Sequence, residues 1–184
     1  MPKTLFFAML ASAVALIAAP NAQSEETKPA MTSETKAIVT PEKSGLLPIG
    51  GLNYYYAIYG KGEPLLLLHG GLGTSDMFAP ILPKFAEHRT VIAVDMQGHG
   101  RTALGERPFS IDAMGDDMAA IVKTLGYDKV DVMGYSLGGG VAFRMAVQHP
   151  EAVRRLVLVS TGYSTDGFYD EMRPQQAQVS AAAA

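Results

Sequence analysis

The sequence contains no cysteine and no tryptophan among its 184 residues. The lack of cysteine excludes disulfide bonds, thiol nucleophiles and zinc sites built on cysteine. Positive charge is also scarce, because 15 Lys and Arg stand against 18 Asp and Glu and give a net charge of −3. Such a chain offers no basic surface to nucleic acid, so we expect no nucleic-acid partner. Its length is sufficient for one domain with a hydrophobic core.

The first residues resemble an export signal. Lys3 precedes an uncharged, apolar run, Leu5–Ala19, and a charged stretch follows. The pattern predicts a secretory signal peptide over residues 1–22, cleaved after Ala22, and a secreted or periplasmic protein with no membrane contact beyond export. An uncleaved membrane anchor is the less favoured alternative, because about fifteen apolar residues fall short of the roughly twenty that span a bilayer.

Composition divides the remainder of the chain. Residues 23–44 are rich in Ser, Thr, Glu, Lys and Pro, which predicts a flexible linker. From residue 45 to 163 strand-like and helix-like segments alternate, and we expect one core there. Residues 164–184 are polar and aromatic and then rich in Gln and Ala, which favours the start of a lid or a truncated tail.

A serine between two glycines follows an apolar run in the segment VDVMGYSLGG, residues 130–139. Gly134, Ser136 and Gly138 form a G-x-S-x-G pattern, which predicts a nucleophile elbow between a strand and a helix. Such a turn strains the backbone of the serine and makes its hydroxyl protrude. The pattern arises by chance in roughly one chain of this length in twenty. A second motif upstream makes an accidental turn the less favoured alternative.

The upstream motif is PLLLLHGGLG, residues 64–73. Four leucines bounded by proline and glycines predict a strand that is buried on both faces, as in a parallel sheet. The glycines that follow His69 allow backbone N–H groups to turn toward a ligand. A third segment, TVIAVDMQGHGRT at residues 90–102, predicts another apolar strand followed by a glycine-rich loop that contains Asp95.

These three motifs, in this order, resemble the α/β-hydrolase family over about residues 46–163. The resemblance implies a mostly parallel central sheet with helices on both faces, here C-terminally incomplete. It also implies an oxyanion hole made by backbone N–H groups of Gly71 and Leu72 and of Leu137, the residue after the nucleophile. His69, Gly70, Gly134, Gly138 and Asp95 are then motif residues with structural roles, Asp95 bracing its own loop.

Other elements follow from periodicity. Residues 46–49 and 52–59 predict two strands joined through Gly50-Gly51. A helix is expected around Phe78–Phe85, shortened or kinked at Pro83. Ser110 is a candidate N-cap for a helix whose apolar stripe ends near Gly126, with methionines as core residues. Residues 154–160 predict another buried strand.

The chemistry implied by Ser136 is acyl transfer to a serine hydroxyl. Attack on a carbonyl carbon produces a tetrahedral oxyanion that two N–H groups stabilise. We therefore expect a small-molecule acyl substrate, with no metal and no cofactor. The sequence makes no prediction about oligomeric state.

The general base is not evident among the four histidines. A serine needs a base, normally a histidine oriented by a carboxylate. His69 belongs to the oxyanion loop, His88 is expected at the surface, and His99 is expected to be structural or to line the pocket. His149 follows Ser136, but the length of a helix, roughly 20 Å, separates them.

The acid is also not evident. In the family the order is nucleophile, acid, histidine, and Asp166 is an outside candidate for the acid. Asp128 and Asp131 precede the serine and are expected at loops or strand ends. We therefore expect the base and acid beyond residue 184, the chain to be an N-terminal portion of a longer enzyme, and this portion alone to be nearly inactive.

Two classes of function remain. The first is an exported serine hydrolase that cleaves an ester, amide or related acyl bond; the alternative is a noncatalytic binding or interaction protein on a truncated hydrolase scaffold. Carbon–carbon bond hydrolases and proline-type aminopeptidases share the loop pattern, but Leu72-Gly73 in place of Pro-Gly disfavours the peptidase. A serine at position 136 argues against dehalogenases and epoxide hydrolases, which use a carboxylate there.

Overall fold

A computed structural model describes residues 39–162. The predicted signal peptide, most of the predicted linker and the predicted tail, residues 164–184, lie outside the described residues, as do Asp166 and Tyr163. Within residues 39–162, no helix is both long enough and apolar enough to cross a membrane. Strand β1 begins at Lys43, two residues before the expected start of the core at residue 45.

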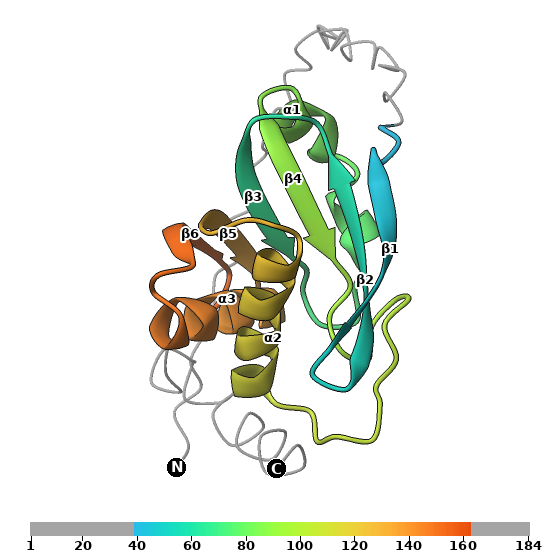
Figure 1. The fold of residues 1–184 in the computed structure, drawn as a ribbon, viewed down its shortest axis with the longest axis vertical. Coiled ribbons are helices and arrows are strands. Elements are labelled where there is room, and N and C mark those ends of the chain that lie inside the picture. Colours follow the sequence, from blue (N-terminus) through green and yellow to red (C-terminus); the bar gives the residue numbers. More distant parts are fainter. Residues whose placement is uncertain (1–38, 163–184) are drawn as a thin grey trace, which may run out of the picture. The chain divides into compact units, whose positions relative to one another are not determined.

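The described residues form six strands, three α-helices and one short 3₁₀ helix (Figure 1). In chain order they are β1 (Lys43–Ile49), β2 (Leu52–Tyr59), β3 (Glu63–Leu68), η1 (Ser75–Phe78), α1 (Leu82–Ala86), β4 (Arg89–Val94), α2 (Ile111–Thr124), β5 (Val130–Tyr135), α3 (Leu137–Gln148) and β6 (Val153–Val159). From β3 onward strands and helices alternate, which is the pattern of a parallel sheet with crossover helices.

All six strands belong to one sheet in the order β1-β2-β4-β3-β5-β6. β1 and β2 form an antiparallel hairpin, and β2 pairs antiparallel with β4. β4, β3, β5 and β6 are parallel to one another. β3 is central, and Leu65–Leu68 are buried because strands flank them and helices cover both faces. The mostly parallel sheet predicted from the sequence is confirmed.

Helices cover the two faces of the sheet unequally. On one face, α2 and α3 pack over Leu66, Leu68 and their neighbours and form the larger apolar cluster. On the other face, Phe78 of η1 and Leu82 of α1 pack over Leu65, Leu67 and Val91. Alternate leucines of β3 therefore face opposite clusters, since successive side chains of a strand point to opposite sides.

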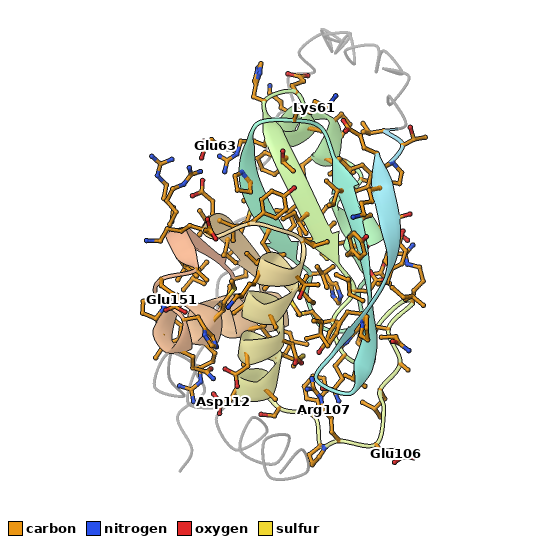
Figure 2. All side chains as sticks on the ribbon, in the orientation of Figure 1. Lys61, Glu63, Glu106, Arg107, Asp112 and Glu151 are labelled. Atoms are coloured by element: carbon orange, nitrogen blue, oxygen red, sulfur yellow. The ribbon has the colours of Figure 1, made fainter. Side chains whose placement is uncertain are left out.

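The parallel strands place three loops at one edge of the sheet. The segments that follow β3, β4 and β5 all leave from the carboxyl ends of these strands, where open α/β sheets bind their ligands. In Figure 2, Lys61 and Glu63 lie near the start of β3, whereas Arg107 and Asp112 lie at the opposite end of the sheet. The candidate site is therefore sought at the carboxyl edge.

Most predicted elements are confirmed. The hairpin turns at Gly50 and Gly51, which both have positive φ. Helix α2 begins after Ser110, whose hydroxyl accepts a hydrogen bond from the Ala113 N–H, and Gly126 with φ 91° follows its end. Its methionines are buried in the core, as expected.

Two sequence predictions need correction. The single helix expected around Phe78–Phe85 is divided into η1 and α1, because Pro83 lies in the first turn of α1 and cannot continue an earlier helix. The last strand was expected to be buried, but β6 is the edge of the sheet formed by residues 39–162. There Val157 is 51% and Leu158 39% exposed, since β5 is the only strand that pairs with β6 in residues 39–162.

Candidate active site

Ser136 occupies the turn between β5 and α3, as the nucleophile-elbow pattern predicts. Its φ of 50° and ψ of −115° lie outside the regions open to ordinary L-residues. A non-glycine residue in such a conformation costs on the order of 1–3 kcal/mol and is retained where the surrounding structure enforces it. Ser136 precedes α3 without a side-chain capping bond, so its hydroxyl is not used to cap the helix.

Two glycines enforce this turn. A Cβ on Gly134 would lie 2.2 Å from the Gly138 carbonyl oxygen, and a Cβ on Gly138 would lie 2.3 Å from the Leu68 carbonyl oxygen. Both distances are far shorter than an ordinary contact, so only glycine allows the strand and helix to approach this closely. The Gly138 N–H also donates to the His69 carbonyl oxygen (3.0 Å), which fastens α3 to the end of β3.

The loop after β3 lies against this turn. A Cβ on Gly70 would meet the Ser136 Cβ at 3.4 Å, and a Cβ on Gly71 would meet the Leu137 Cβ at 3.9 Å. Leu72 has a φ of 59° and a fully exposed side chain, so the loop turns sharply there. The structure therefore brings Gly70 next to the serine and Gly71 next to Leu137. The oxyanion-hole roles of Gly71, Leu72 and Leu137 stay predictions.

Some N–H groups in the first turn of α3 donate backbone hydrogen bonds and one does not. The Gly138 N–H donates to His69, and the Gly139 and Gly140 N–H groups both donate to the Ser136 carbonyl oxygen. In the described part of the chain, no backbone acceptor binds the Leu137 N–H, nor those of Gly71 and Leu72. These are the three groups nominated for the oxyanion hole. The N-terminal end of α3 adds partial positive charge there.

His69 holds the loops after β3 and β4 together. The ring is fully buried; its Nδ1–H donates to the Gly70 carbonyl oxygen (2.8 Å) and its Nε2 accepts from the Met96 N–H (3.0 Å). Burial lowers the pKa of the His69 ring below its ordinary value, which favours the neutral form that this pair of bonds requires. Since both nitrogens are engaged, His69 is not available as a base in this arrangement.

Asp95, at the end of β4, organises the loop that follows it. The carboxylate is buried and accepts hydrogen bonds from the Ser75 N–H (2.7 Å) and from the Arg101 N–H (2.9 Å) and Nε (2.7 Å). Burial alone would raise the pKa of Asp95, but the hydrogen bonds from Arg101 and Ser75 lower it to about 2. Arg101 also lies over the Tyr55 ring, 3.9 Å from its centroid.

The other three histidines occupy different surroundings. His99 is half-buried, its Nδ1–H donates to the Gln97 carbonyl oxygen (2.8 Å), and its ring lies 5.1 Å from that of His69. His88 is exposed. His149 follows the last residue of α3 and pairs with Asp116 (2.8 Å) and Glu151 (3.5 Å). Helix α3 therefore separates His149 from Ser136.

Sequence reasoning missed two buried ionic clusters. Asp131 is the second residue of β5, at a strand end as expected, but its ionic partners were not foreseen: it accepts bonds from Arg89 (2.5 Å) and Arg154 (2.7 Å). Asp117 is buried with Arg107 beside the loop after β4. The sequence did indicate that Asp117 is buried, because it stands three residues after Met114 and four before Ile121, on the apolar stripe of α2.

Comparison with known proteins gives a family. The family model of the alpha/beta hydrolase fold matches residues 63–182. The 2-hydroxy-6-oxo-6-(2'-aminophenyl)hexa-2,4-dienoic acid hydrolase of Metapseudomonas resinovorans is 32% identical over 129 residues, which cover 68% of this chain and 44% of that protein. The soluble epoxide hydrolase of Corynebacterium sp. strain C12 is 38% identical over 111 residues, 60% of this chain and 39% of that protein.

Comparison with a solved structure supports the same family. The epoxide hydrolase CorEH superposes with a TM-score of 0.67 at 32% identity, over 74% of this chain and 50% of that one. This chain spans half or less of the length of these proteins. The match over residues 63–182, together with the sheet order and the turn at Ser136, shows that the chain belongs to the α/β-hydrolase fold family.

Proposed function

We propose that this protein is an exported serine hydrolase that cleaves an ester, amide or related acyl bond in a small molecule, with Ser136 as the nucleophile. One observation carries the proposal: Ser136 stands in a strained turn against Gly70 of the loop after β3, and the N–H of Leu137, which follows it, has no backbone acceptor among residues 39–162. Strain of this kind is retained at functional sites. A turn with no function would be relieved by glycine or by a change of backbone.

The proposed reaction follows from this geometry. The Ser136 Oγ attacks the carbonyl carbon, its proton passes to a general base, and the carbonyl oxygen becomes an oxyanion. The N–H groups of Leu137 and of Gly71 or Leu72 donate to that oxyanion, and the removal of one such donor typically costs about 3–4 kcal/mol of barrier. Collapse of the intermediate expels the alcohol or amine, and water then releases the acyl group from the serine.

The base and the acid are proposed to come from residues outside 39–162. Within that range His69 uses both ring nitrogens, the Nδ1–H of His99 is bonded to the Gln97 carbonyl oxygen within its own loop, His88 is exposed and His149 lies beyond the far end of α3. Without a base the serine lacks a contribution typically worth about 10²- to 10⁴-fold. We therefore propose that residues 1–184 alone hydrolyse substrates very slowly.

The serine at position 136 favours a substrate class different from those that the names of some relatives give. Similar proteins include an epoxide hydrolase, a fluoroacetate dehalogenase of Burkholderia sp and a 2-hydroxymuconate semialdehyde hydrolase of Pseudomonas sp. strain CF600. A carboxylate nucleophile suits epoxide and halide substrates, whereas this chain has a serine hydroxyl at the turn. Acyl substrates are therefore favoured over epoxides and alkyl halides.

Export is proposed from Lys3 and the apolar run of residues 5–19 alone. N-terminal sequencing of the protein from its native source tests it. A mature N-terminus near Gln23 outside the cytoplasm supports export, and an intact Met1 on a cytoplasmic product refutes it.

Hydrolysis of p-nitrophenyl esters tests the proposed activity. The chain extended to the natural end of its reading frame should hydrolyse p-nitrophenyl acetate. Ser136→Ala should abolish this turnover, whereas Ser44→Ala, an exposed serine in β1, should not change it. Failure of the extended chain to cleave any activated ester would favour the noncatalytic binding protein instead. Rapid turnover by residues 1–184 would show that a described histidine, His99 or His69, acts as base.

A further inference from the structure

The long segment between β4 and α2 borders the candidate site. We refer to residues 96–109 as the wall loop. It leaves the carboxyl end of β4, beside the loop after β3, because β4 and β3 are neighbours in the sheet. It ends at the start of α2, where Ile111 is 3.8 Å from the Cβ position of Gly140 in the first turn of α3. The wall loop therefore runs from the oxyanion loop round to the nucleophile helix.

Two rings of the wall loop lie near the oxyanion loop. The His99 ring is 5.1 Å from His69, whose neighbour Gly70 contacts Ser136, and 6.5 Å from the Phe109 ring. Both rings are partly exposed.

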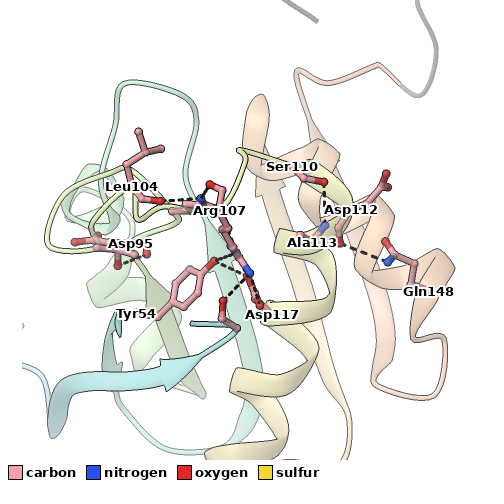
Figure 3. Close-up of polar contacts among 12 residues, drawn as sticks. Tyr54, Asp95, Leu104, Arg107, Ser110, Asp112, Ala113, Asp117 and Gln148 are labelled. Carbon is pink, nitrogen blue, oxygen red and sulfur yellow. Dashed lines mark hydrogen bonds and ion pairs between the residues drawn. The ribbon is translucent and has the colours of Figure 1, made fainter. Parts of the chain in front are cut away.

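A buried ionic cluster anchors the wall loop to α2 and to the β1–β2 hairpin (Figure 3). The Arg107 guanidinium pairs with the Asp117 carboxylate of α2 and donates to the Tyr54 hydroxyl of β2 (2.9 Å) and to the Gly50 carbonyl oxygen (3.2 Å). Tyr54 donates in turn to Asp117 (2.6 Å). Burial, with the hydrogen bond to Asp117, raises the pKa of the Tyr54 phenol. One arginine thus ties the loop to α2 and to the hairpin.

Gln97 connects Arg107 to other residues of the wall loop by hydrogen bonds. Its side chain is fully buried; Oε1 accepts from Arg107 Nε (3.1 Å), and Nε2 donates to the Leu104 (2.8 Å) and Arg107 (3.3 Å) carbonyl oxygens. The backbone carbonyl oxygen of the same residue accepts from His99 Nδ1 (2.8 Å). The chain of contacts therefore runs from Asp117 through Arg107 and Gln97 to the His99 ring.

Stability alone does not account for this cluster. Buried ion pairs are often replaced by apolar residues without loss of stability, so a retained pair is weak evidence of a stabilising role. Here the planar guanidinium meets four separate acceptors and fixes their relative positions, which an ammonium group cannot do. The contacts fix geometry, and that geometry belongs to a loop beside the nucleophile.

We propose that Arg107 is a positioning residue that, through Gln97, holds the wall loop as a fixed surface selecting substrates with an extended apolar acyl chain. This inference rests on the proposed function of Ser136. It predicts that loss of the guanidinium reduces turnover of long-chain esters more than that of acetate esters, because a two-carbon acyl group does not reach the wall loop. A merely structural role would lower both activities together with the folded fraction.

The test compares two esters in the full-length protein. The ratio of kcat/KM for p-nitrophenyl hexanoate to that for p-nitrophenyl acetate is measured for the unchanged protein, for Arg107→Met and for the milder Arg107→Lys. We expect the ratio to fall about tenfold or more in Arg107→Met, because misplacing a binding surface by about 1 Å costs up to 10²-fold. The fall should appear mainly in KM and persist in Arg107→Lys, since one ammonium cannot replace the guanidinium fork.

Arg154→Met is the matched control. Arg154 is also part of a buried ion pair, with Asp131, but at the opposite end of the sheet, so its loss should leave the ratio unchanged. An unchanged ratio in a folded Arg107→Lys protein, or an equal fall in Arg154→Met, overturns the inference while Ser136-dependent hydrolysis stands. Absence of Ser136-dependent hydrolysis in the unchanged protein overturns the proposed function and this inference together.

Discussion

Replacing Gly138 by alanine should destabilise the fold by forcing α3 away from the end of β3. The new Cβ would lie 2.3 Å from the Leu68 carbonyl oxygen and 2.5 Å from that of His69, and both are backbone atoms that cannot rotate away. Reaching even a 3.4 Å contact requires a shift of about 1 Å in a close-packed region. Overpacking of this kind typically costs about 1–3 kcal/mol, and the gain in helix propensity offsets less than about 1 kcal/mol of it.

Gly140→Ala provides the matched control in the same helix. Among residues 39–162, its Cβ would meet only Ile111 side-chain atoms at 3.8 Å, an ordinary contact, so the variant should gain up to about 1 kcal/mol from helix propensity. In urea titrations monitored by circular dichroism, the midpoint should fall for Gly138→Ala and hold or rise for Gly140→Ala. Equal midpoints for the two variants would refute the close approach of α3 to the oxyanion loop.

Three further outcomes are expected. The pKa of Asp95 is lowered to about 2 in the folded state, so its ionised carboxylate stabilises the fold above the unfolded pKa, and this stabilisation is lost as the pH falls. Between about pH 5 and 2, urea titrations should show that the free energy of unfolding falls by about 2 kcal/mol more in the unchanged protein than in Asp95→Asn. Asp131→Asn should lower the free energy of unfolding by about 3–5 kcal/mol, whereas Asp112→Asn, which breaks an exposed pair with Arg144, should lower it by less than about 1 kcal/mol. Equal urea midpoints for these two variants would contradict this expectation. Ser136→Gly should unfold at a higher temperature than Ser136→Ala, because glycine relieves a positive φ worth about 1 kcal/mol or more.

The local signals in the sequence were sufficient for most of the fold. The leucine run of β3, the capping serine of α2 and the glycines around Ser136 each act through neighbours close in the chain, and the structure has them as predicted. Pro83 was recognised as a breaker, but its position in the first turn of a separate helix depends on how η1 packs against the sheet.

Contacts between residues far apart in the sequence were harder to predict. Arg107 lies 53 residues from Tyr54, and Arg89 lies 42 residues from Asp131, so no periodicity within one element links them. A carboxylate on the apolar stripe of α2 indicates that a partner exists without identifying it. The exposed surface of β6 was missed for a related reason, because an apolar strand does not reveal how many neighbours pair with it.

Ser136 is proposed to be an activated nucleophile in the full-length protein. Labelling with a fluorophosphonate, which phosphonylates activated serines, followed by peptide mass spectrometry tests it most directly. We expect one adduct, on the peptide that contains Ser136, and its loss in Ser136→Ala and after heat denaturation. An unlabelled folded protein, or an adduct on another serine that persists in Ser136→Ala, would show that Ser136 is not the nucleophile.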